Sequence, residues 1–240
     1  MSSPAQQPSL GHPRVHLRRT DSTSDRARVL ALAGAPHGTL VTASEQTAGR
    51  GRQGRRWSTP AGSALLMSLV LRSPPPLLPL LAALAVCDVA GEQAQIKWPN
   101  DIVLARGEQL AKLAGILAEG RPQEGWAVLG IGINVAVRVE DLPPELHETA
   151  ATLERGASEL EPALYELLSA LERRLAEPTD SMLTAWRARD ALRGREIAWG
   201  AGQGRAEGVD GAGRLVVALD GGGRTALDAG EVHLREVGRR

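Results

Sequence analysis

The chain has 240 residues, of which 42% are hydrophobic and 2% aromatic, and its formal net charge is zero. This length predicts one substantial domain plus a small one, with a core built from aliphatic side chains. The balanced charge argues against a nucleic-acid-binding protein, because such proteins carry a basic excess. The single cysteine excludes an internal disulfide and a thiolate zinc cluster.

The N-terminus is polar and shows no signal-peptide pattern. The longest apolar stretch, residues 77–86, contains Pro79 and is too short to span a bilayer. We therefore predict a cytoplasmic protein that makes no membrane contact.

The predicted elements begin after a disordered tail over residues 1–12. A strand over 14–20 precedes a helix that begins near Ser22, Thr23 and Ser24, all good N-cap residues, and ends near Gly34. Further strands are predicted over 39–43, 63–71, 95–98, 101–105, 110–120 and 126–135, and helices over 77–89, 160–176 and 181–192. Short β-like pieces separated by glycines follow, which is typical of a small independent barrel.

The segment 44–57 (SEQTAGRGRQGRRW) interleaves glycines with four arginines, and no acidic residue occurs from Gln46 to Cys87. Glycine lets backbone N–H groups approach a ligand, and arginine donates charge-assisted hydrogen bonds to anions. We expect an anion-binding loop that is mobile when empty and is ordered by its ligand, so that it shields a reactive intermediate from water.

Two other interpretations of this loop are a dinucleotide-binding fingerprint and a solvated basic loop. Gly49, Gly51 and Gly54 match the dinucleotide fingerprint literally, but that fingerprint opens a helix and needs an acid about 20 residues later. Pro60 follows instead, and the next acidic residue is Asp88, so we reject it. A solvated basic loop that touches RNA is the remaining alternative.

The chain has two lysines, Lys97 and Lys112, whereas its other 26 basic residues are arginine. Lysine is a compact point charge and arginine a planar fork. Lys112 interrupts an apolar strand, where an ammonium must find an anion or lose its charge. A lysine that reaches water at the strand edge is the alternative. Gly115 lies one position off the Lys112 face of a regular strand and leaves room for close packing.

Five segments occur in a fixed order: DSTS (21–24), SEQTAGRGRQG (44–54), KWPND (97–101), KLAGIL (112–117) and GIGIN (130–134). Together they resemble the biotin protein ligases, which attach biotin to a lysine of a carboxylase carrier domain. The resemblance runs from about residue 20 to the C-terminus. It is to the short form without an N-terminal DNA-binding domain, because 20 residues precede Asp21.

The resemblance implies an α+β fold, in which a mixed β-sheet flanked by helices covers residues 13–192 and a small SH3-like β-barrel covers 193–240. The catalytic domain is similar to lipoate ligases and class II aminoacyl-tRNA synthetases. The implied enzyme is a biotin–[acetyl-CoA-carboxylase] ligase that uses ATP and Mg²⁺. Biotin's carboxylate attacks the α-phosphate, pyrophosphate leaves, and the acceptor lysine then attacks biotinyl-5′-AMP and releases AMP. The implied partner is a biotin carboxyl carrier protein, without DNA, and the enzyme is a monomer or homodimer.

The resemblance also implies residue roles. Lys112 matches the lysine that bridges the biotin carboxylate and the α-phosphate, and Arg50 and Lys97 are the other implied catalytic cations. The implied ATP contacts are Arg50, Arg52, Lys97 and Asn134. The implied biotin contacts are Ser22, Thr23, Ser24, Gln46, Gly49, Arg50, Gly51, Arg52, Lys112 and Gly115. No residue is assigned as a metal ligand. The tryptophan that stacks on adenine in some relatives has no counterpart near residues 149–153.

The chemistry agrees with this interpretation on independent grounds. Joining a carboxylate to a phosphate needs fixed cations in a dry site rather than a nucleophile or a catalytic triad. A lipoate or octanoate ligase is the nearest alternative, and a biotin-responsive transcription repressor is an alternative of another class. The few residues before Asp21 leave no room for a helix-turn-helix, so we predict no operator binding.

Overall fold

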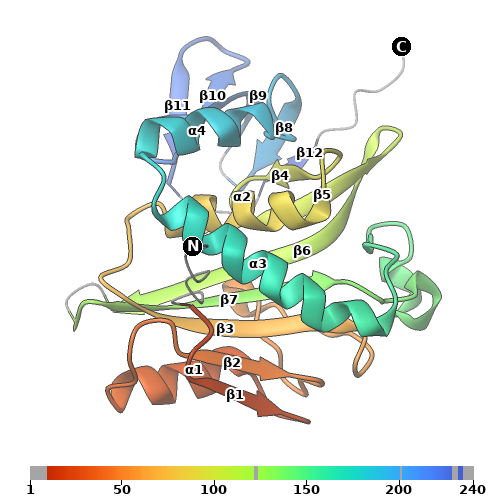
Figure 1. The fold of residues 1–240 in the computed structure, drawn as a ribbon. Helices are drawn as coiled ribbons and strands as arrows, with labels where there is room; N and C mark the ends of the chain where they lie inside the picture. Colours follow the sequence, from red (N-terminus) through yellow and green to blue (C-terminus); the bar gives the residue numbers. More distant parts are fainter. Residues whose placement is uncertain (1–9, 122–123, 201, 229–231, 235–240) are drawn as a thin grey trace, which may run out of the picture.

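The structure is a computed structural model that describes residues 10–121, 124–200, 202–228 and 232–234 (Figure 1). Within these residues the chain forms a seven-stranded mixed sheet, a five-stranded antiparallel sheet and four α-helices. No helix among them is both long and apolar enough to serve as a membrane span.

The large sheet has the strand order β1-β2-β3-β7-β6-β5-β4. β1 and β2 are parallel because helix α1 crosses between them, and all the other pairs are antiparallel. This confirms the predicted mixed sheet and its four successive strands from residue 95 onward. The strands are β1 (Arg14–Leu17), β2 (Leu40–Ala43), β3 (Ala64–Arg72), β4 (Gln95–Lys97), β5 (Asp101–Arg106), β6 (Gln109–Arg121) and β7 (Trp126–Asn134).

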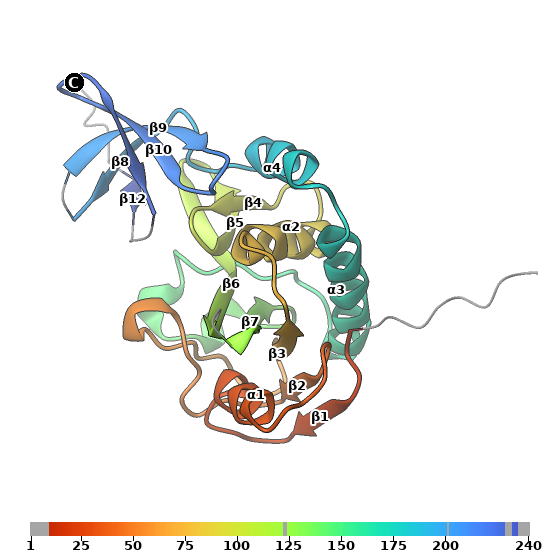
Figure 2. The same ribbon diagram turned by 90° about the vertical axis from the view of Figure 1, so that its left-hand side faces the viewer.

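Helices cover the two faces of this sheet unequally (Figure 2). On β3, Leu69 and Leu71 face the core under α2 (Leu78–Ala90) and α3 (Leu160–Leu175), whereas Val70 faces α1 (Thr23–Leu32). This alternation follows from the two-residue period of a strand. α2 is apolar apart from the exposed Asp88 and is almost completely buried between the sheet and α3.

Cys87 lies inside α2 and is fully buried. Burial raises the pKa of its thiol to about 12, because a thiolate is costly in an apolar environment. A thiol with this pKa holds its proton near neutral pH and is a poor nucleophile. Cys87 therefore serves to pack α2 in the core rather than to act as a nucleophile.

The C-terminal part forms a second antiparallel sheet, of order β11-β10-β9-β8-β12, which lies beyond α2 and α4 (Thr179–Ala188) in Figure 2. Among the described residues β11 and β12 do not pair, so the sheet is open and a closed barrel is not confirmed. Its strands are β8 (Glu196–Trp199), β9 (Gly202–Val209), β10 (Leu215–Leu219), β11 (Arg224–Leu227) and β12 (His233–Leu234).

The second sheet shares its core with the first. Ile197 and Leu215 belong to the same buried cluster as α2. The Trp98 indole Nε1 donates a 3.1 Å hydrogen bond to the carbonyl oxygen of Gly213. Gly213 has φ of +78°, and a side chain there would come within 2.9 Å of Leu77. The C-terminal sheet therefore packs directly on the KWPND turn, more intimately than an independent barrel would.

The predicted helix over 181–192 ends at Ala188, earlier than expected. Asp190 then forms an isolated parallel bridge with Ile96 of β4: the Ile96 amide donates to Arg189 O at 2.7 Å, and the Ala191 amide to Ile96 O at 2.9 Å. This pairing satisfies backbone groups at the outer edge of β4. Local helix propensity contains no information about that distant strand.

The predicted disordered tail over 1–12 is wrong at its last residues, while residues 1–9 lie outside the described part. Leu10 is 1% exposed and belongs to the main core. Its amide donates to Glu172 Oε1 at 2.9 Å, and the Gly11 amide donates to Gly38 O at 2.9 Å. A single apolar residue in a polar segment shows no periodicity, so its burial was not predictable.

Leu10→Ala should therefore lower the free energy of unfolding by about 2–4 kcal/mol, the usual cost of a buried leucine truncation. Leu32→Ala is the matched control, because Leu32 is 56% exposed on α1 and its loss should cost within about 0.5 kcal/mol. Urea titration measures both. Equal, near-zero effects would show that Leu10 belongs to a loose tail.

Candidate active site

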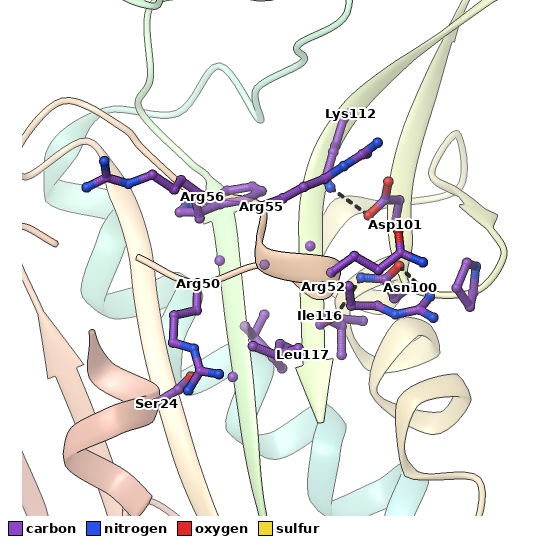
Figure 3. Close-up of a pocket in the computed structure, with 18 of the residues that line it drawn as sticks. Ser24, Arg50, Arg52, Arg55, Arg56, Asn100, Asp101, Lys112, Ile116 and Leu117 are labelled. Carbon is purple, nitrogen blue, oxygen red and sulfur yellow. Dashed lines mark hydrogen bonds and ion pairs between the residues drawn. The ribbon is translucent and has the colours of Figure 1, made fainter. Parts of the chain in front are cut away.

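The glycine–arginine loop between β2 and β3 folds back on itself beside the centre of the large sheet (Figure 3). The Trp57 amide donates to Gly49 O at 2.9 Å, and the Gly51 amide donates to Arg55 O at 2.7 Å. A side chain at Gly49 would overlap the carbonyl oxygen of Trp57 and the amide of Gln46. Gly49 is therefore required for the shape of the loop rather than for direct contact with a ligand.

Beneath the loop lies a cavity of about 160 Å³ between the start of α1, the β4–β5 turn, β6 and β7. Nine of the twelve predicted site residues line it. Ser22, Gly49 and Asn134 do not. The nine lining residues are Thr23, Ser24, Gln46, Arg50, Gly51, Arg52, Lys97, Lys112 and Gly115.

Lys112 extends into this cavity from β6 and meets a carboxylate (Figure 3). Its Nζ lies 2.7 Å from Asp101 Oδ1 in the β4–β5 turn, and the two side chains are 40% and 23% exposed. The expected anion for this strand lysine is thus a residue of the KWPND segment. The arrangement places an ammonium at the cavity wall with one internal partner.

A β-bulge brings Gly115 to the face of Lys112, which corrects the prediction from regular alternation. Val103 pairs with Lys112 and Ile102 with Ala114, so Leu113 is the extra residue. A Cβ at Gly115 would lie 3.5 Å from Lys112 Nζ and 3.2 Å from the Trp57 ring. The bulge therefore directs the Lys112 side chain across Gly115. The group that packs closely on Gly115 is the Trp57 indole.

Trp57 is a site residue that the sequence interpretation missed. Its indole covers Gly132, where a Cβ would lie 2.7 Å from the ring, and Lys112 Nζ lies 5.7 Å from a Trp57 ring centroid. Its Nε1 is buried and has no hydrogen-bond partner among the described residues. The available signal was its place at the end of the loop segment in a chain with few aromatic residues.

Arg50 is held by two carboxylates. Its Nη1 donates to Asp25 Oδ1 on α1 at 2.9 Å, and its Nη2 donates to Glu119 Oε1 on β6 at 2.8 Å. The loop is thereby tied to both sides of the cavity. Neither acid belongs to a recognised segment, so the sequence interpretation missed both. The catalytic role of Arg50 stays a prediction, since its contacts here are structural.

Arg52 and Lys97 lie toward the KWPND turn. Arg52 Nη1 lies 3.4 Å from Asn100 Oδ1. Asn100 also fastens the KWPND turn to β6. Its side-chain Nδ2 donates to Ile116 O at 2.7 Å, and its backbone carbonyl accepts from the Ile116 amide at 3.0 Å. Lys97, Arg52 and Lys112 thus gather positive charge at one end of the cavity.

The other end is lined by neutral polar side chains, next to the guanidinium of Arg50 that Asp25 and Glu119 hold (Figure 3). The Thr23 amide and hydroxyl both donate to Gln46 Oε1, at 2.7 and 3.0 Å. The hydroxyls of Thr23 and Ser24 both contact Ser68 Oγ, at 2.9 and 3.1 Å. Ser68 is fully buried on β3 and was not singled out from the sequence. The arrangement has a polar end for a neutral group and a cationic end for anions.

Ser22 and Asn134 are buried outside the cavity lining. Ser22 is the N-cap residue of α1, and its Oγ has no hydrogen-bond partner among the described residues. The amide of Ser22 donates to Asp21 Oδ1 at 2.8 Å, and this bond, with one from Thr20, holds the pKa of Asp21 below its ordinary value. Asn134 Nδ2 donates to Ala151 O at 2.8 Å. The ligand contacts predicted for both residues stay predictions.

Comparison with known proteins identifies the family to which this chain belongs. The model of the biotin/lipoate A/B protein ligase family matches residues 16–135. The bifunctional ligase/repressor BirA of Bacillus subtilis is 45% identical over 150 residues, which is 58% of this chain and 45% of that protein. The biotin–[acetyl-CoA-carboxylase] ligase of Mycobacterium tuberculosis is 36% identical over 90% of this chain and 87% of its own.

A solved structure shows the same fold. The biotin protein ligase from Aquifex aeolicus in complex with biotin and ATP superposes with a TM-score of 0.75 and 26% identity, covering 93% of this chain and 99% of its own. The chain spans about half the length of the Bacillus relatives, 45% and 49%. From the family model and the Mycobacterium relative, the chain is a member of the biotin/lipoate A/B protein ligase family.

Proposed function

We propose that the chain ligates biotin to a lysine of a biotin carboxyl carrier domain, with ATP as co-substrate and biotinyl-5′-AMP as intermediate. The observation that carries this proposal is the two-ended cavity. Gln46, Thr23 and Ser24 form a polar end, and Lys112, Lys97 and Arg52 gather at the cationic end. The names of the relatives and the ligands of the Aquifex structure support the same activity.

In the first step a carboxylate oxygen of biotin forms a bond to the α-phosphorus of ATP, and the bond to pyrophosphate breaks. Two anions must approach each other, and cations already in place lower the cost of bringing them together. Lys112, at the cationic end, would contact both the carboxylate and the α-phosphate. Arg52 and Lys97 would bind the remaining phosphate charge.

In the second step the amine of the acceptor lysine forms an amide bond with the acyl carbon, and AMP leaves with the former carboxylate oxygen. Before that step the mixed anhydride must be kept from water. The loop of Arg50 and Trp57 covers the cavity, and the Arg50 bonds to Asp25 and Glu119 hold it closed. Trp57 offers an aromatic face on which the adenine can stack. It would take the role of the tryptophan that is missing near residues 149–153.

The residues present also suit Mg²⁺, which would arrive with ATP and neutralise phosphate charge. Magnesium takes oxygen ligands and keeps several from water and phosphate. Asp101 and Asn100 place side-chain oxygens at the cationic end of the cavity. Among the described residues no three His, Cys, Asp or Glu side chains converge as a metal site of their own. One or two protein ligands to a nucleotide-bound ion fit this inventory.

A lipoate or octanoate ligase is the second candidate, since the family includes both activities. The polar end favours biotin. A dithiolane ring or a plain acyl chain has no strong hydrogen-bonding groups, and it would leave the hydroxyls of Thr23 and Ser24 without ligand partners.

Several finer points complete the proposal. We propose a catalytic domain over residues 13–192 and an SH3-like barrel over 193–240, supported by the glycine-separated antiparallel strands. We also propose that the protein is a cytoplasmic monomer or homodimer and that it acts without DNA. The zero formal net charge supports the absence of DNA binding. An electrophoretic mobility shift with operator-like duplexes tests the last point, and specific retardation would refute it.

Purified protein incubated with biotin and Mg-ATP, but no acceptor, should accumulate biotinyl-5′-AMP and release pyrophosphate. Mass spectrometry of the ligand pool detects the adenylate directly. Parallel incubations with lipoate and octanoate should yield about 100-fold less adenylate, because a site built for hydrogen-bonding groups rejects ligands that lack them. A dominant lipoyl- or octanoyl-adenylate would assign the other activity, and no adenylate at all would reject the proposal.

Lys112→Arg should lower the rate of adenylate formation by about 100-fold or more. A planar fork on the bulged strand cannot replace a point charge that reaches two oxygens across Gly115. The control is Arg138→Lys, which changes one exposed cation that pairs with Asp141 and does not line the cavity. Pyrophosphate release measured with biotin and ATP reports the rate. Near-normal turnover in Lys112→Arg would remove this residue from the chemistry.

Arg52→Ala and Arg50→Ala should each release the adenylate early, with about a 10-fold or larger rise in its off-rate, because each removes charge-assisted hydrogen bonds. Arg28→Ala is the control, since Arg28 also pairs with Asp25, at 3.0 Å, but lies outside the loop. Stopped-flow intrinsic fluorescence follows the off-rate. If all three variants keep the wild-type off-rate, the loop has no retaining role.

A further inference from the structure

The hydroxyls at the polar end of the cavity are connected in one direction only. The backbone N–H of Thr23 can only donate, so the Gln46 atom that lies 2.7 Å from it must be the carbonyl oxygen Oε1. That oxygen can only accept, so the Thr23 hydroxyl must give its proton to Oε1 across 3.0 Å. Both bonds to Gln46 are therefore fixed by one backbone amide.

The same logic continues into the buried sheet. Because the Thr23 proton is already used, its 2.9 Å contact with Ser68 must carry the Ser68 proton. Because the Ser68 proton is then used too, the 3.1 Å contact between Ser24 and Ser68 must carry the Ser24 proton. The chain runs from Ser24 through Ser68 and Thr23 to Gln46, with no freedom to reverse.

This direction determines what the cavity offers to a ligand. Thr23 and Ser24 line the cavity with their protons turned away, so they present lone pairs only and accept hydrogen bonds. Gln46 has its oxygen occupied and retains the donors of Nε2. Two acceptors and one donor complement a group in which a carbonyl is flanked by N–H, such as a cyclic urea.

Ser68 is the residue on which the polarity of Ser24 depends. It is fully buried and does not line the cavity. Gly130 keeps the connection open, since a Cβ there would lie 2.6 Å from Ser24 Oγ and 3.5 Å from Ser68 Oγ. Without the Ser68 oxygen, the Ser24 hydroxyl would lose its acceptor and turn its proton toward the cavity.

We propose that Ser68 is a positioning residue for ligand selection, which makes Ser24 an obligate acceptor and so requires an N–H donor on the ligand. The inference rests on the proposed function, because it assumes that the cyclic urea of biotin occupies this end of the cavity. It assigns specificity to a side chain that contacts no substrate.

The test compares biotin with a cyclic carbamate analogue, in which a ring oxygen replaces the ureido N–H that faces Ser24. Wild-type enzyme should prefer biotin by about 100-fold or more in kcat/KM for adenylate formation, since a buried acceptor is left unpaired by the analogue. In Ser68→Ala the freed Ser24 proton can bond to the ring oxygen. The preference should then fall at least about 10-fold, while the KM for ATP stays within about twofold.

A matched control separates this effect from general destabilisation. Thr39→Val removes another buried hydroxyl, which donates a 2.8 Å hydrogen bond to Pro36 O. Thr39 does not line the cavity. This substitution should lower the thermal midpoint without changing the preference. Ser24→Ala and the double variant with Ser68→Ala should both show the reduced preference of Ser68→Ala, since both positions act through one chain.

If Ser68→Ala is too unstable to purify, Ser68→Cys keeps the shape with only a weak acceptor and should change the preference in the same direction. An unchanged preference in a folded Ser68 variant overturns the inference and leaves a packing role. Failure of the proposed function would show separately, as absence of biotinyl-5′-AMP from the wild-type enzyme.

Discussion

The ammonium of Lys112 is the charge around which the cavity is arranged, and its ion pair with Asp101 keeps that charge in place. A pair this accessible to water, with side chains 40% and 23% exposed, contributes only about 0–1 kcal/mol. Phosphate and carboxylate oxygens of bound ligands can therefore replace Asp101 as partners at little cost. The ion pair therefore positions the Lys112 ammonium but leaves it able to change partners.

The fold positions this charge through backbone features more than through side-chain packing. The bulge at Leu113 turns Lys112 and Gly115 to one face, and Asn100 fastens the KWPND turn to β6 through bonds to both backbone groups of Ile116. Trp98 joins the same turn to the C-terminal sheet. The turn between Lys97 and Asp101 is therefore fastened to both β6 and the C-terminal sheet.

Sequence reasoning was most successful where a segment carries its own signal. The strands around KWPND and KLAGIL, the start of α1 and the glycine–arginine loop all have strong local patterns, and nine of the predicted site residues line one cavity. It failed where a partner lies far along the chain. Glu119 bonds to Arg50 across 69 positions and Ser68 to Thr23 across 45, and no local pattern marks such contacts. The bulge also escaped, since one extra residue cannot be seen in a two-residue period.

The most direct measurement is a crystal structure with biotin and a non-hydrolysable ATP analogue. We predict that Lys112 Nζ leaves Asp101 to lie within hydrogen-bond distance of both the carboxylate and the α-phosphate, with the ureido ring at Thr23 and Gln46. Phosphates bound away from Lys97 and Lys112, or a biotin ring placed at the cationic end, would contradict the division of the cavity into a polar and a cationic end.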